Sequence, residues 1–524
     1  MTEFINEPLA DFSQAAARRK FAEAIARARA ELGREYPLLI GGRPVQTGRW
    51  IVSENPAHPT QCVGRAAQAS AEHVEEAVQV ALEAQARWAA TPVVERTARL
   101  RRAAQLIRER RDGLAALVVF EAGKPWREAD ADVVEAIDYL EYYSARMEAL
   151  AAGVPLSQRP GESNRYGYGP RGVCAVIAPW NFPLGILAGM ASSALAAGNV
   201  VILKPAEQSP VTAAHLARLL HEAGLPPGVV QYLPGYGEEV GRALVQHPAV
   251  RLIMFTGSRA VGCAILAEAA KVAGGQRFVK HVVVEMGGKN AIIVDEDADL
   301  DEAVKGIATS AFSYQGQKCS AASRVIVHEA VYDRLVERLS AAADGLVVGD
   351  PAEPRCDLGP LIDREARARV TAAIDDGART ARCRYRYPAA QVPSEGYFVG
   401  PALLEGVDPR ARLAQEELFG PVACLFRVRR FDEAIQLAND VDYGLTGGVY
   451  SRSPSHLQHA REAFDVGNLY LNRPIVGSIV GRQPFGGHKL SGLGTKAGGP
   501  DYLLQLVVPK TICENTSRHG MPLE

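Results

Sequence analysis

Apolar side chains in the first 150 residues recur every three or four positions. This is the period of an amphipathic helix that packs one face against a core. Five helices are expected from it, at residues 12–33, 71–89, 93–110, 113–122 and 127–150. The string Gly123-Lys124-Pro125 should separate the last two, because glycine and proline end helices. Only two short strands are expected in this region, at residues 36–40 and 50–53.

From residue 173 onward, short apolar runs alternate with helical segments, most of them about ten residues or longer. Five strands are expected here, at residues 173–178, 200–203, 229–232, 252–255 and 281–285. Strict alternation predicts βαβ units and a parallel, doubly wound sheet. A sheet of this class binds its ligand at the carboxyl ends of its strands.

A second α/β segment is expected from about residue 291 to residue 471. It includes strands at 324–327 and 424–428 and a helix at 331–342. A stretch rich in glycine and proline follows at 474–500, and a final strand is expected at 502–508. The length of 524 residues fits two to four domains.

One uncharged stretch, residues 172–203, is long enough to suggest a membrane span. However, Pro179, Asn181 and Pro183 near its start would break a continuous helix. The segment is therefore expected to form a buried strand, a loop, a buried helix and a second buried strand. No membrane association is predicted.

Charge and cysteine usage narrow the class further. With 58 basic and 60 acidic residues, the chain has no field of one sign that would attract nucleic acid. The eight cysteines include no C-x-x-C pair, which argues against a zinc ribbon, a thioredoxin-type site or a disulfide scaffold. No metal site is expected. The N-terminus lacks the apolar core of a signal peptide. A reducing cytoplasm fits these features best.

Polar residues after two of the expected strands are typical of a dinucleotide site. Lys204 and Glu207 lie at a strand end, where both could reach ribose hydroxyls, and the Glu207 carboxylate should repel a 2′-phosphate. A surface ion pair is the alternative. Gly257-Ser258 ends another strand and begins a helix, whose free N–H groups and dipole suit a pyrophosphate. These residues favour NAD over NADP.

Three further residues have the chemistry of acyl transfer. Cys319 lies among small and polar residues, and a helix starting there, together with Lys318, would favour its thiolate. Glu285 ends a buried strand, where desolvation would raise its pKa and make it a general base. Asn181, held between two prolines, could donate to an oxyanion. The alternatives are a structural cysteine, a salt bridge and a turn asparagine.

The motifs resemble those of the aldehyde dehydrogenase superfamily. The similar segments are residues 179–183, 204–207, 255–258, 285–290, 316–319, 417–421 and 484–487. The resemblance implies an α/β fold with a Rossmann-like NAD-binding domain, an α/β catalytic domain and a small β oligomerisation flap. The expected ranges are 1–151 with 173–289 for the first, 290–484 for the second, and 152–172 with 485–524 for the flap.

The resemblance also implies a role for each motif residue. Cys319 would be the nucleophile, Asn181 and the Cys319 N–H the oxyanion hole, and Glu285 the base that activates water. The cofactor residues would be Lys204, Glu207, Gly257, Ser258, Glu417, which would hold the nicotinamide ribose, and Phe419, which would border the nicotinamide ring.

Four segments are similar to the 1-pyrroline-5-carboxylate dehydrogenase branch, which oxidises L-glutamate γ-semialdehyde to glutamate in proline degradation. They are residues 318–320, 477–478, 483–487 and 496–502. In that branch the N–H groups of Gly477 and Ser478 would hold the α-carboxylate, and Phe182 and Phe485 would enclose the aliphatic chain. The other substrate residues would be Ser320, Lys318 and Glu135. Residues 473–476, Ala322 and His488 depart from the expected pattern, so a dehydrogenase of another acid semialdehyde or a general aldehyde stays open.

Alternatives of other classes are a non-redox cysteine acyl transferase or hydrolase, a CoA-acylating dehydrogenase and a non-catalytic structural relative. A non-redox transferase or hydrolase would have no use for Lys204, Glu207 and Glu417. Glu285 argues against a CoA-acylating dehydrogenase, because a base at this position activates water for hydrolysis of the thioester. The resemblance further implies a homodimer or a dimer-based higher oligomer. A separate proline dehydrogenase could be a functional partner.

Overall fold

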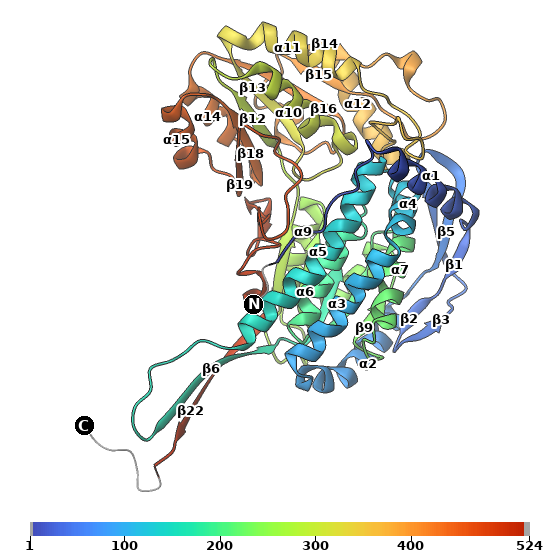
Figure 1. Ribbon diagram of the computed structural model, residues 1–524, viewed down its shortest axis with the longest axis vertical. Helices are drawn as coiled ribbons and strands as arrows, with labels where there is room; N and C mark the ends of the chain where they lie inside the picture. Colours follow the sequence, from blue (N-terminus) through green and yellow to red (C-terminus); the bar gives the residue numbers. More distant parts are fainter. Residues whose placement is uncertain (1–3, 518–524) are drawn as a thin grey trace.

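The N-terminal region is helical in the computed structural model, which describes residues 4–517 (Figure 1). Its helices are α1 (Ala15–Ala30), α2 (Ala71–Ala90), α3 (Val93–Glu109), α4 (Arg111–Ala122) and α5 (Trp126–Ala151). All five expected helices are confirmed. Gly123 ends α4 with a φ of 65°, a backbone conformation that glycine adopts without strain.

The first large sheet has eight strands in the order β21-β11-β10-β7-β8-β9-β2-β3. Its central strands are β7 (Val173–Ile177), β8 (Val200–Lys204), β9 (Val230–Tyr232), β10 (Val250–Thr256) and β11 (His281–Glu285). They pair in parallel, as the alternating pattern predicts. The antiparallel edge strands are β2 (Leu38–Ile40), β3 (Arg43–Val45) and β21 (Gly492–Leu493).

Helices cover both faces of this sheet, which explains why its strands are continuous apolar runs. The helices α3, α5, α6 (Gly185–Ala196) and α7 (Pro210–Glu222) pack together on one face. The helices α2, α8 (Arg242–Gln246) and α9 (Arg259–Ala269) pack on the other. Residues 172–203 form a buried strand, a loop, a buried helix and a buried strand, as expected. Among the described residues, no helix is long and apolar enough to cross a membrane.

The second large sheet has seven strands in the order β14-β15-β16-β13-β12-β18-β19 (Figure 1). They are β12 (Asn290–Val294), β13 (Ala322–His328), β14 (Arg382–Arg386), β15 (Ala402–Glu405), β16 (Val422–Val428), β18 (Thr446–Tyr450) and β19 (Asn468–Leu471). Its helices are α10 (Leu300–Phe312), α11 (Glu329–Asp344), α12 (Arg364–Thr380), α14 (Phe431–Asn439) and α15 (Pro454–Ala463). Along β12 the buried side chains alternate between two apolar cores, one on each face of the sheet.

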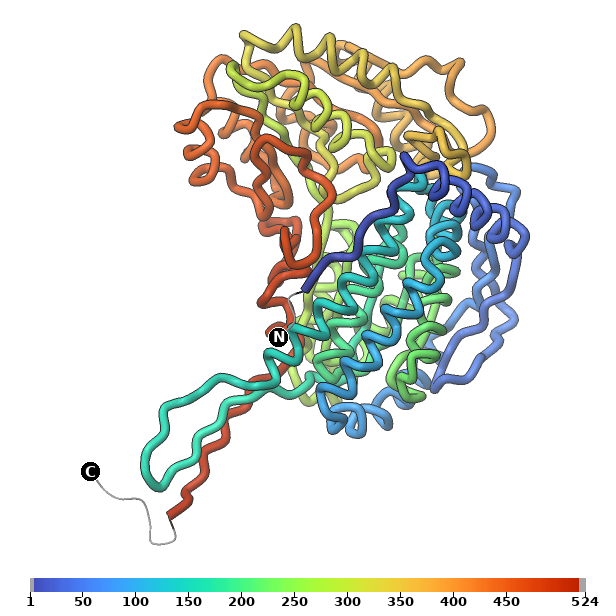
Figure 2. Tube along the Cα trace, viewed as in Figure 1, coloured from blue at the N-terminus to red at the C-terminus, as the bar shows by residue number. Residues whose placement is uncertain are grey.

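A two-stranded ribbon projects away from both sheets (Figures 1 and 2). It is formed by β6 (Glu162–Pro170) and β22 (Val507–Asn515), which pair antiparallel along their whole length. Residues 485–506, which the sequence groups with this flap, return to the main body, where β21 joins the first sheet. The N-terminal segment lies along α5, where Asn6 Nδ2 donates to the Asp138 carboxylate at 2.8 Å (Figure 2).

Two of the expected strands are wrong in part. Residues 502–506 form a short 3-10 helix (Tyr502–Leu506) instead of a strand, and the ring of Tyr502 stacks on Tyr143 of α5 at 5.4 Å. Residues 36–40 are split between β1 (Arg34–Tyr36) and β2. The first strand joins a small sheet with β4 (Trp50–Asn55) and β5 (His58–Ala67), so the chain changes sheets at this point.

Candidate active site

Four predicted site residues meet at one edge of the first sheet. They are Asn181 after β7, Lys204 at the end of β8, Gly257 after β10 and Glu285 at the end of β11. The four strands are parallel neighbours, so their carboxyl ends lie side by side. From β7 and β10 the chain winds outward in opposite directions. The crevice at such a switch point is where doubly wound sheets bind ligands.

The residues predicted to hold adenosine form a closed set of hydrogen bonds. Lys204 Nζ lies 3.0 Å from Glu207 Oε1, which also accepts the N–H of Gly237 at 2.7 Å. Gly237 begins the short π-helix η1 (Gly237–Gly241), which follows β9. Ser258 is the N-cap of α9 and accepts the N–H of Val261 at 3.4 Å. A ribose diol and a diphosphate match this set of a cation, a carboxylate and helix-terminal N–H groups.

Glu285 combines burial with an unused hydrogen-bonding atom. Its Oε2 is buried and has no partner among the described residues. Burial raises the pKa of the Glu285 carboxyl to about 8, while the N–H of Gly487 and the charge of Lys496 oppose that shift. A Cβ added at Gly486 would lie 2.9 Å from Glu285 Oε1, so glycine is needed at this close approach. A carboxyl with this pKa can exchange protons near neutral pH.

The loop carrying Cys319 is held by distant side chains. Asn290 Nδ2 donates to the carbonyls of Cys319 at 2.7 Å and Ala321 at 2.8 Å. The Oδ1 of Asn290 accepts the N–H of Thr446 at 3.0 Å. Asn181 Nδ2 donates to the Gln317 carbonyl at 3.0 Å, so the predicted oxyanion donor touches this loop directly. The segment is therefore fixed from three strands at once.

Two expectations for Cys319 are wrong. No helix begins there, because residues 317–321 form a turn that runs into β13. Lys318 does not offer a free charge, because its Nζ pairs with Glu128 at 2.7 Å. Burial, with Glu417 and Glu285 nearby, raises the pKa of the Cys319 thiol. A proton acceptor or a bound cation must therefore assist the thiol.

Glu417 and Phe419 precede β16 of the second sheet, and Glu417 lies against the loop between β11 and β12, while the Phe419 ring packs against Trp180. Glu417 Oε1 accepts the N–H of Gly288 at 3.0 Å, and burial raises the Glu417 pKa to about 7. A Cβ at Gly287 would overlap the Glu417 carboxylate, and a Cβ at Gly288 would lie 2.6 Å from the Cys319 carbonyl oxygen. Phe419 has a φ of 57°, a strained conformation for this residue type. The two glycines therefore allow Glu417 and the Cys319 carbonyl to pack directly against the backbone between β11 and β12.

The loop predicted to hold the substrate's α-carboxylate, at Gly477 and Ser478, has two backbone N–H groups with no hydrogen-bond acceptor among the described residues. Gly477 has a φ of 74°, and no atom lies within 4 Å of its missing Cβ. In the part of the chain that the structure describes, the N–H groups of Gly477 and Ser478 have no hydrogen-bond acceptor. The hydroxyl of Ser478 donates to the Gln483 carbonyl at 2.9 Å, and Gln483 Oε1 accepts the N–H of Ile479 at 3.1 Å. Two free N–H groups on a braced loop suit a carboxylate.

The remaining predicted substrate residues come from three segments. Ser320 is buried, and its carbonyl accepts the Thr446 hydroxyl at 3.2 Å. Phe182 packs edge to face against Tyr314, with ring centroids 6.4 Å apart. Phe485 pairs with Ala497 through two backbone hydrogen bonds. Glu135 lies on α5, and its pKa is raised to about 7 by burial and by Asp132.

Sequence reasoning missed the charged groups beside Glu135. Glu128, Asp132 and Glu135 are spaced by four and three residues, so they share one face of α5. Lys124 pairs with Asp132, and Lys318 with Glu128. Three carboxylates at this spacing on a helix with an apolar core face are the signal that could have revealed them.

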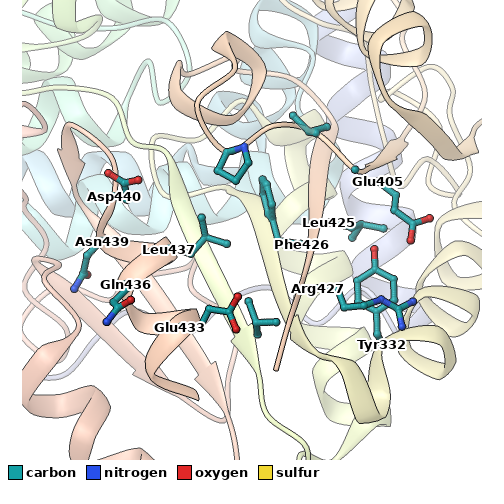
Figure 3. A pocket seen from close by; sticks show the side chains of 14 residues that line it. Tyr332, Glu405, Leu425, Phe426, Arg427, Glu433, Gln436, Leu437, Asn439 and Asp440 are labelled. Atoms are coloured by element: carbon teal, nitrogen blue, oxygen red, sulfur yellow. The ribbon is translucent and has the colours of Figure 1, made fainter. Parts of the chain in front are cut away.

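One surface pocket, of about 900 Å³, lies outside this site (Figure 3). It is lined by residues of β15, β16 and α14 together with Tyr332 of α11, and none of the predicted site residues belongs to it. Arg427 lies over the Tyr332 ring at 4.0 Å and pairs with Asp333 at 2.7 Å. Residues 4–517 contain no cluster of three or more histidine, cysteine or acidic side chains that could hold a metal ion.

Comparison with known families agrees with this geometry. The model of the aldehyde dehydrogenase family matches residues 44–512. This match covers most of the chain, and the chain belongs to that family.

Similar individual proteins carry names that are narrower than that of the family. The chain is 49% identical over 509 residues to a 1-pyrroline-5-carboxylate dehydrogenase of Geobacillus sp. (strain WCH70), covering 97% of this chain and 98% of the relative. It is 47% identical over 513 residues to 1-pyrroline-5-carboxylate dehydrogenase 2 of Bacillus subtilis (strain 168), covering 98% of this chain and 99% of the relative.

Solved structures extend the likeness to the fold. A Thermus 1-pyrroline-5-carboxylate dehydrogenase with bound NAD matches with a TM-score of 0.95 and 47% identity, over 98% of this chain and 100% of that chain. Proline utilization A from Bdellovibrio bacteriovorus matches with a TM-score of 0.97 and 46% identity. There all of this chain corresponds to 54% of the longer one. The Rossmann-like and catalytic α/β sheets with a projecting ribbon are thus the fold of this family.

Proposed function

We propose that this chain oxidises L-glutamate γ-semialdehyde to L-glutamate, with NAD as hydride acceptor and Cys319 as nucleophile. The observation that carries the proposal is that the N–H groups of Gly477 and Ser478 have no hydrogen-bond acceptor among the described residues. The same chain also has Cys319, Asn181 and Glu285, the residues of the proposed chemistry. A general aldehyde needs no such anion site, whereas an amino acid semialdehyde does. The names of relatives at 47–49% identity support the same substrate.

The first half of the reaction is assigned to Cys319 and Asn181. The thiolate adds to the aldehyde carbon, and the resulting oxyanion receives hydrogen bonds from the Asn181 amide and the Cys319 N–H. Collapse of this adduct expels a hydride and leaves a thioester on Cys319. Because the buried thiol holds its proton tightly, the proton must pass to Glu285 or to water before attack.

The second half is assigned to Glu285. Its carboxylate takes a proton from a water molecule, and the hydroxide attacks the thioester carbon. The C–S bond then breaks and releases the carboxylic acid, while Cys319 recovers its proton. The pKa of about 8 and the unpartnered Oε2 support this role.

The residues present fit NAD. Lys204 and Glu207 would hold the adenosine ribose, Gly257 and Ser258 the diphosphate, and Glu417 the nicotinamide ribose, with Phe419 against the ring. When bound, NAD supplies the carbon that accepts the hydride. Glu207 places a negative charge where NADP carries its 2′-phosphate, which favours NAD.

The substrate is proposed to lie between Cys319 and the anchor loop. Gly477 and Ser478 would donate to its α-carboxylate, and Phe182 and Phe485 would enclose its methylene groups. Ser320 and Lys318 would border the aldehyde end. Glu135 would meet the ammonium group.

We further propose a cytoplasmic homodimer or dimer-based oligomer that works beside a separate proline dehydrogenase. The projecting ribbon supports the oligomer, and the likeness to part of the longer proline utilization A chain supports the functional partner. The ranges 1–151 with 173–289 and 290–484 would act as cofactor and catalytic domains, and the ribbon of β6 and β22 would supply the flap, without residues 485–506.

The test follows NADH formation by near-ultraviolet absorbance with L-glutamate γ-semialdehyde, succinate semialdehyde and propanal. Wild type should prefer the glutamate semialdehyde, and Cys319→Ala should lose at least about a thousandfold in rate. Cys263→Ala, a half-buried cysteine on α9, is the matched control and should keep its activity. Robust activity on another aldehyde would overturn the substrate assignment, and no reduction of NAD with any aldehyde would overturn the dehydrogenase.

A further inference from the structure

Lys124 is a fully buried lysine with an unusual set of neighbours. It stands between α4 and α5, and its side chain is 0% exposed. Its Nζ lies 3.4 Å from Asp132 Oδ2, yet neither atom has a hydrogen-bond partner among the described residues. Burying an ammonium without hydrogen bonds is costly, so a structural role alone would favour a smaller or apolar residue.

The faces of two aromatic rings lie against this ammonium. Lys124 Nζ is 3.5 Å from the ring centroid of Phe182 and 4.8 Å from that of Tyr314. The Tyr314 hydroxyl donates to the Ala122 carbonyl at 3.0 Å, which fixes this ring to the end of α4. Attraction between a cation and a ring face is strongest where water is excluded. Phe182 is only partly buried.

Asp132 connects the same pair to the oxyanion loop. Its Oδ1 accepts the N–H of Gly185 at 2.8 Å, at the first residue of α6. A Cβ at Gly185 would lie 2.8 Å from that oxygen, so the helix start fits closely against the carboxylate. Asn181 and Phe182 lie just before this helix. Lys124 and Asp132 thus hold the loop from two directions, one through a ring and one through a backbone N–H.

We propose that Lys124 is a positioning residue that sets the specificity for the amino acid semialdehyde by clamping the ring of Phe182. This inference rests on the proposed function, since Phe182 is there one wall of the site for the substrate's aliphatic chain. A fixed ring presents one surface to the methylene groups while the anchor loop holds the carboxylate. A short aldehyde, held only at its carbonyl, does not need that wall.

The experiment compares variants that separate the ring contact from the charge on Asp132. Lys124→Met alone would leave a buried carboxylate uncompensated, so it is combined with Asp132→Asn, whose Oδ1 can still accept from Gly185. Lys124→Gln with Asp132→Asn is a second neutral pair in which the two amides can bond each other. Lys280→Met is the control, because Lys280 is also buried and holds carbonyls of Val245 and His247 at 2.6 Å, away from Phe182.

The readout is the split between KM and kcat on L-glutamate γ-semialdehyde, beside kcat/KM on propanal. Both neutral pairs should raise KM for the semialdehyde at least about fivefold, with kcat and propanal activity within about twofold of wild type. In a Phe182→Leu background the same pairs should add no further change. Lys124→Arg, which keeps a cation over the ring, should retain a KM near that of the wild type.

An unchanged KM in folded neutral pairs, or an equal loss on propanal, would overturn the clamp and leave Lys124 as a counter-charge for Asp132. Such a result would not touch the proposed function, because the wild type would still prefer the semialdehyde. A wild type inactive on the semialdehyde would overturn the substrate assignment and this inference with it.

Discussion

The cofactor edge lies on the first sheet, whereas the reaction centre combines residues next to both sheets, and the carboxylates of the two regions have opposite surroundings. The cofactor edge is Lys204, Glu207, Gly257 and Ser258, and the reaction centre is Asn181, Glu285, Cys319 and Glu417. At the cofactor edge, Glu207 has a lysine and an N–H as partners. In the reaction centre, one buried oxygen of Glu285 has no hydrogen-bond partner among the described residues. Burial raises the pKa of the Glu285 carboxyl and of the Glu417 carboxyl.

The difference teaches which region binds and which region reacts. A carboxylate with matched partners is already ordered, so it can receive hydroxyl groups without moving protons. A desolvated carboxylate without a partner has a pKa near neutrality, so it can take a proton and return it. Changes in the reaction centre should therefore alter turnover, whereas changes at the cofactor edge should alter which dinucleotide is used.

The largest effect is expected from Glu285→Gln. Steady-state turnover should fall by about 10²–10⁴, because no base remains to activate water, while one NADH per Cys319 should still form in the first turnover. In wild type, turnover should rise with pH up to about 8, because the carboxylate is the active form and its pKa is about 8. Stopped-flow absorbance separates the first turnover from later ones. Equal loss of both phases would assign Glu285 to the thiol instead of water.

A smaller loss is expected from Gly477→Ala. Alanine is strained at a φ of 74° by roughly 1–2 kcal/mol, so the loop should shift and misplace its two N–H groups. KM for the glutamate semialdehyde should rise about tenfold with little change in kcat or in propanal oxidation. Gly224→Ala is the matched control, because its φ of 87° is equally strained and its Cβ would meet nothing within 4 Å. An effect of the same size in the control would remove the anchor role.

Much of the fold could be predicted because its signals are local. The apolar runs at 173–178, 200–203 and 281–285 are strands whose ends carry polar residues, and the sheet brings those ends together. Lys204, Glu285 and Asn181 could be chosen from this pattern alone. The cofactor edge was the easiest part, since Glu207 and Gly237 come from consecutive strand–helix turns.

The predictions that were wrong concern features that depend on contacts between distant segments. The Cys319 loop is not a helix because Asn290 and Thr446 hold its carbonyls from two other strands. The charge of Lys318 is taken by Glu128, which lies 190 positions away in the chain. Residues 502–506 have mostly apolar side chains that fit either a strand or a short helix, and packing of Tyr502 on Tyr143 favours the helix.

Glu207→Gln, at the cofactor edge, should change the preference for NAD over NADP and leave the chemical step intact. The amide can still accept from Gly237, so binding of NAD should weaken only modestly. The loss of negative charge should improve kcat/KM with NADP relative to NAD by about tenfold. Steady-state rates with both dinucleotides measure the ratio, and Glu222→Gln, an exposed glutamate paired with Arg110, is the control. An unchanged ratio would show that Glu207 does not face the 2′ position.

The smallest effect is one on stability, and its sign separates the two regions. The carboxyl of Glu285 has a folded pKa of about 8 against an ordinary value of 4.5. Between these values the folded state keeps a proton that the unfolded state releases, so stability falls as pH rises through this window. Glu285→Gln has no carboxyl to titrate, so it does not lose stability in this pH window. Its Tm should match wild type near pH 5 and exceed it by a few degrees, about 2–4 °C, above pH 8.

Glu207→Gln should behave in the opposite way in the same thermal scans. It removes the negative charge that pairs with Lys204, whose side chain is only 4% exposed, so the variant should be less stable than wild type at pH 5 and above pH 8 alike. A gain in Tm for Glu285→Gln that does not grow with pH would mean that the carboxylate is solvated in the folded protein. The reaction centre would then lack the desolvation that gives Glu285 its basicity, and the two regions would no longer differ in kind.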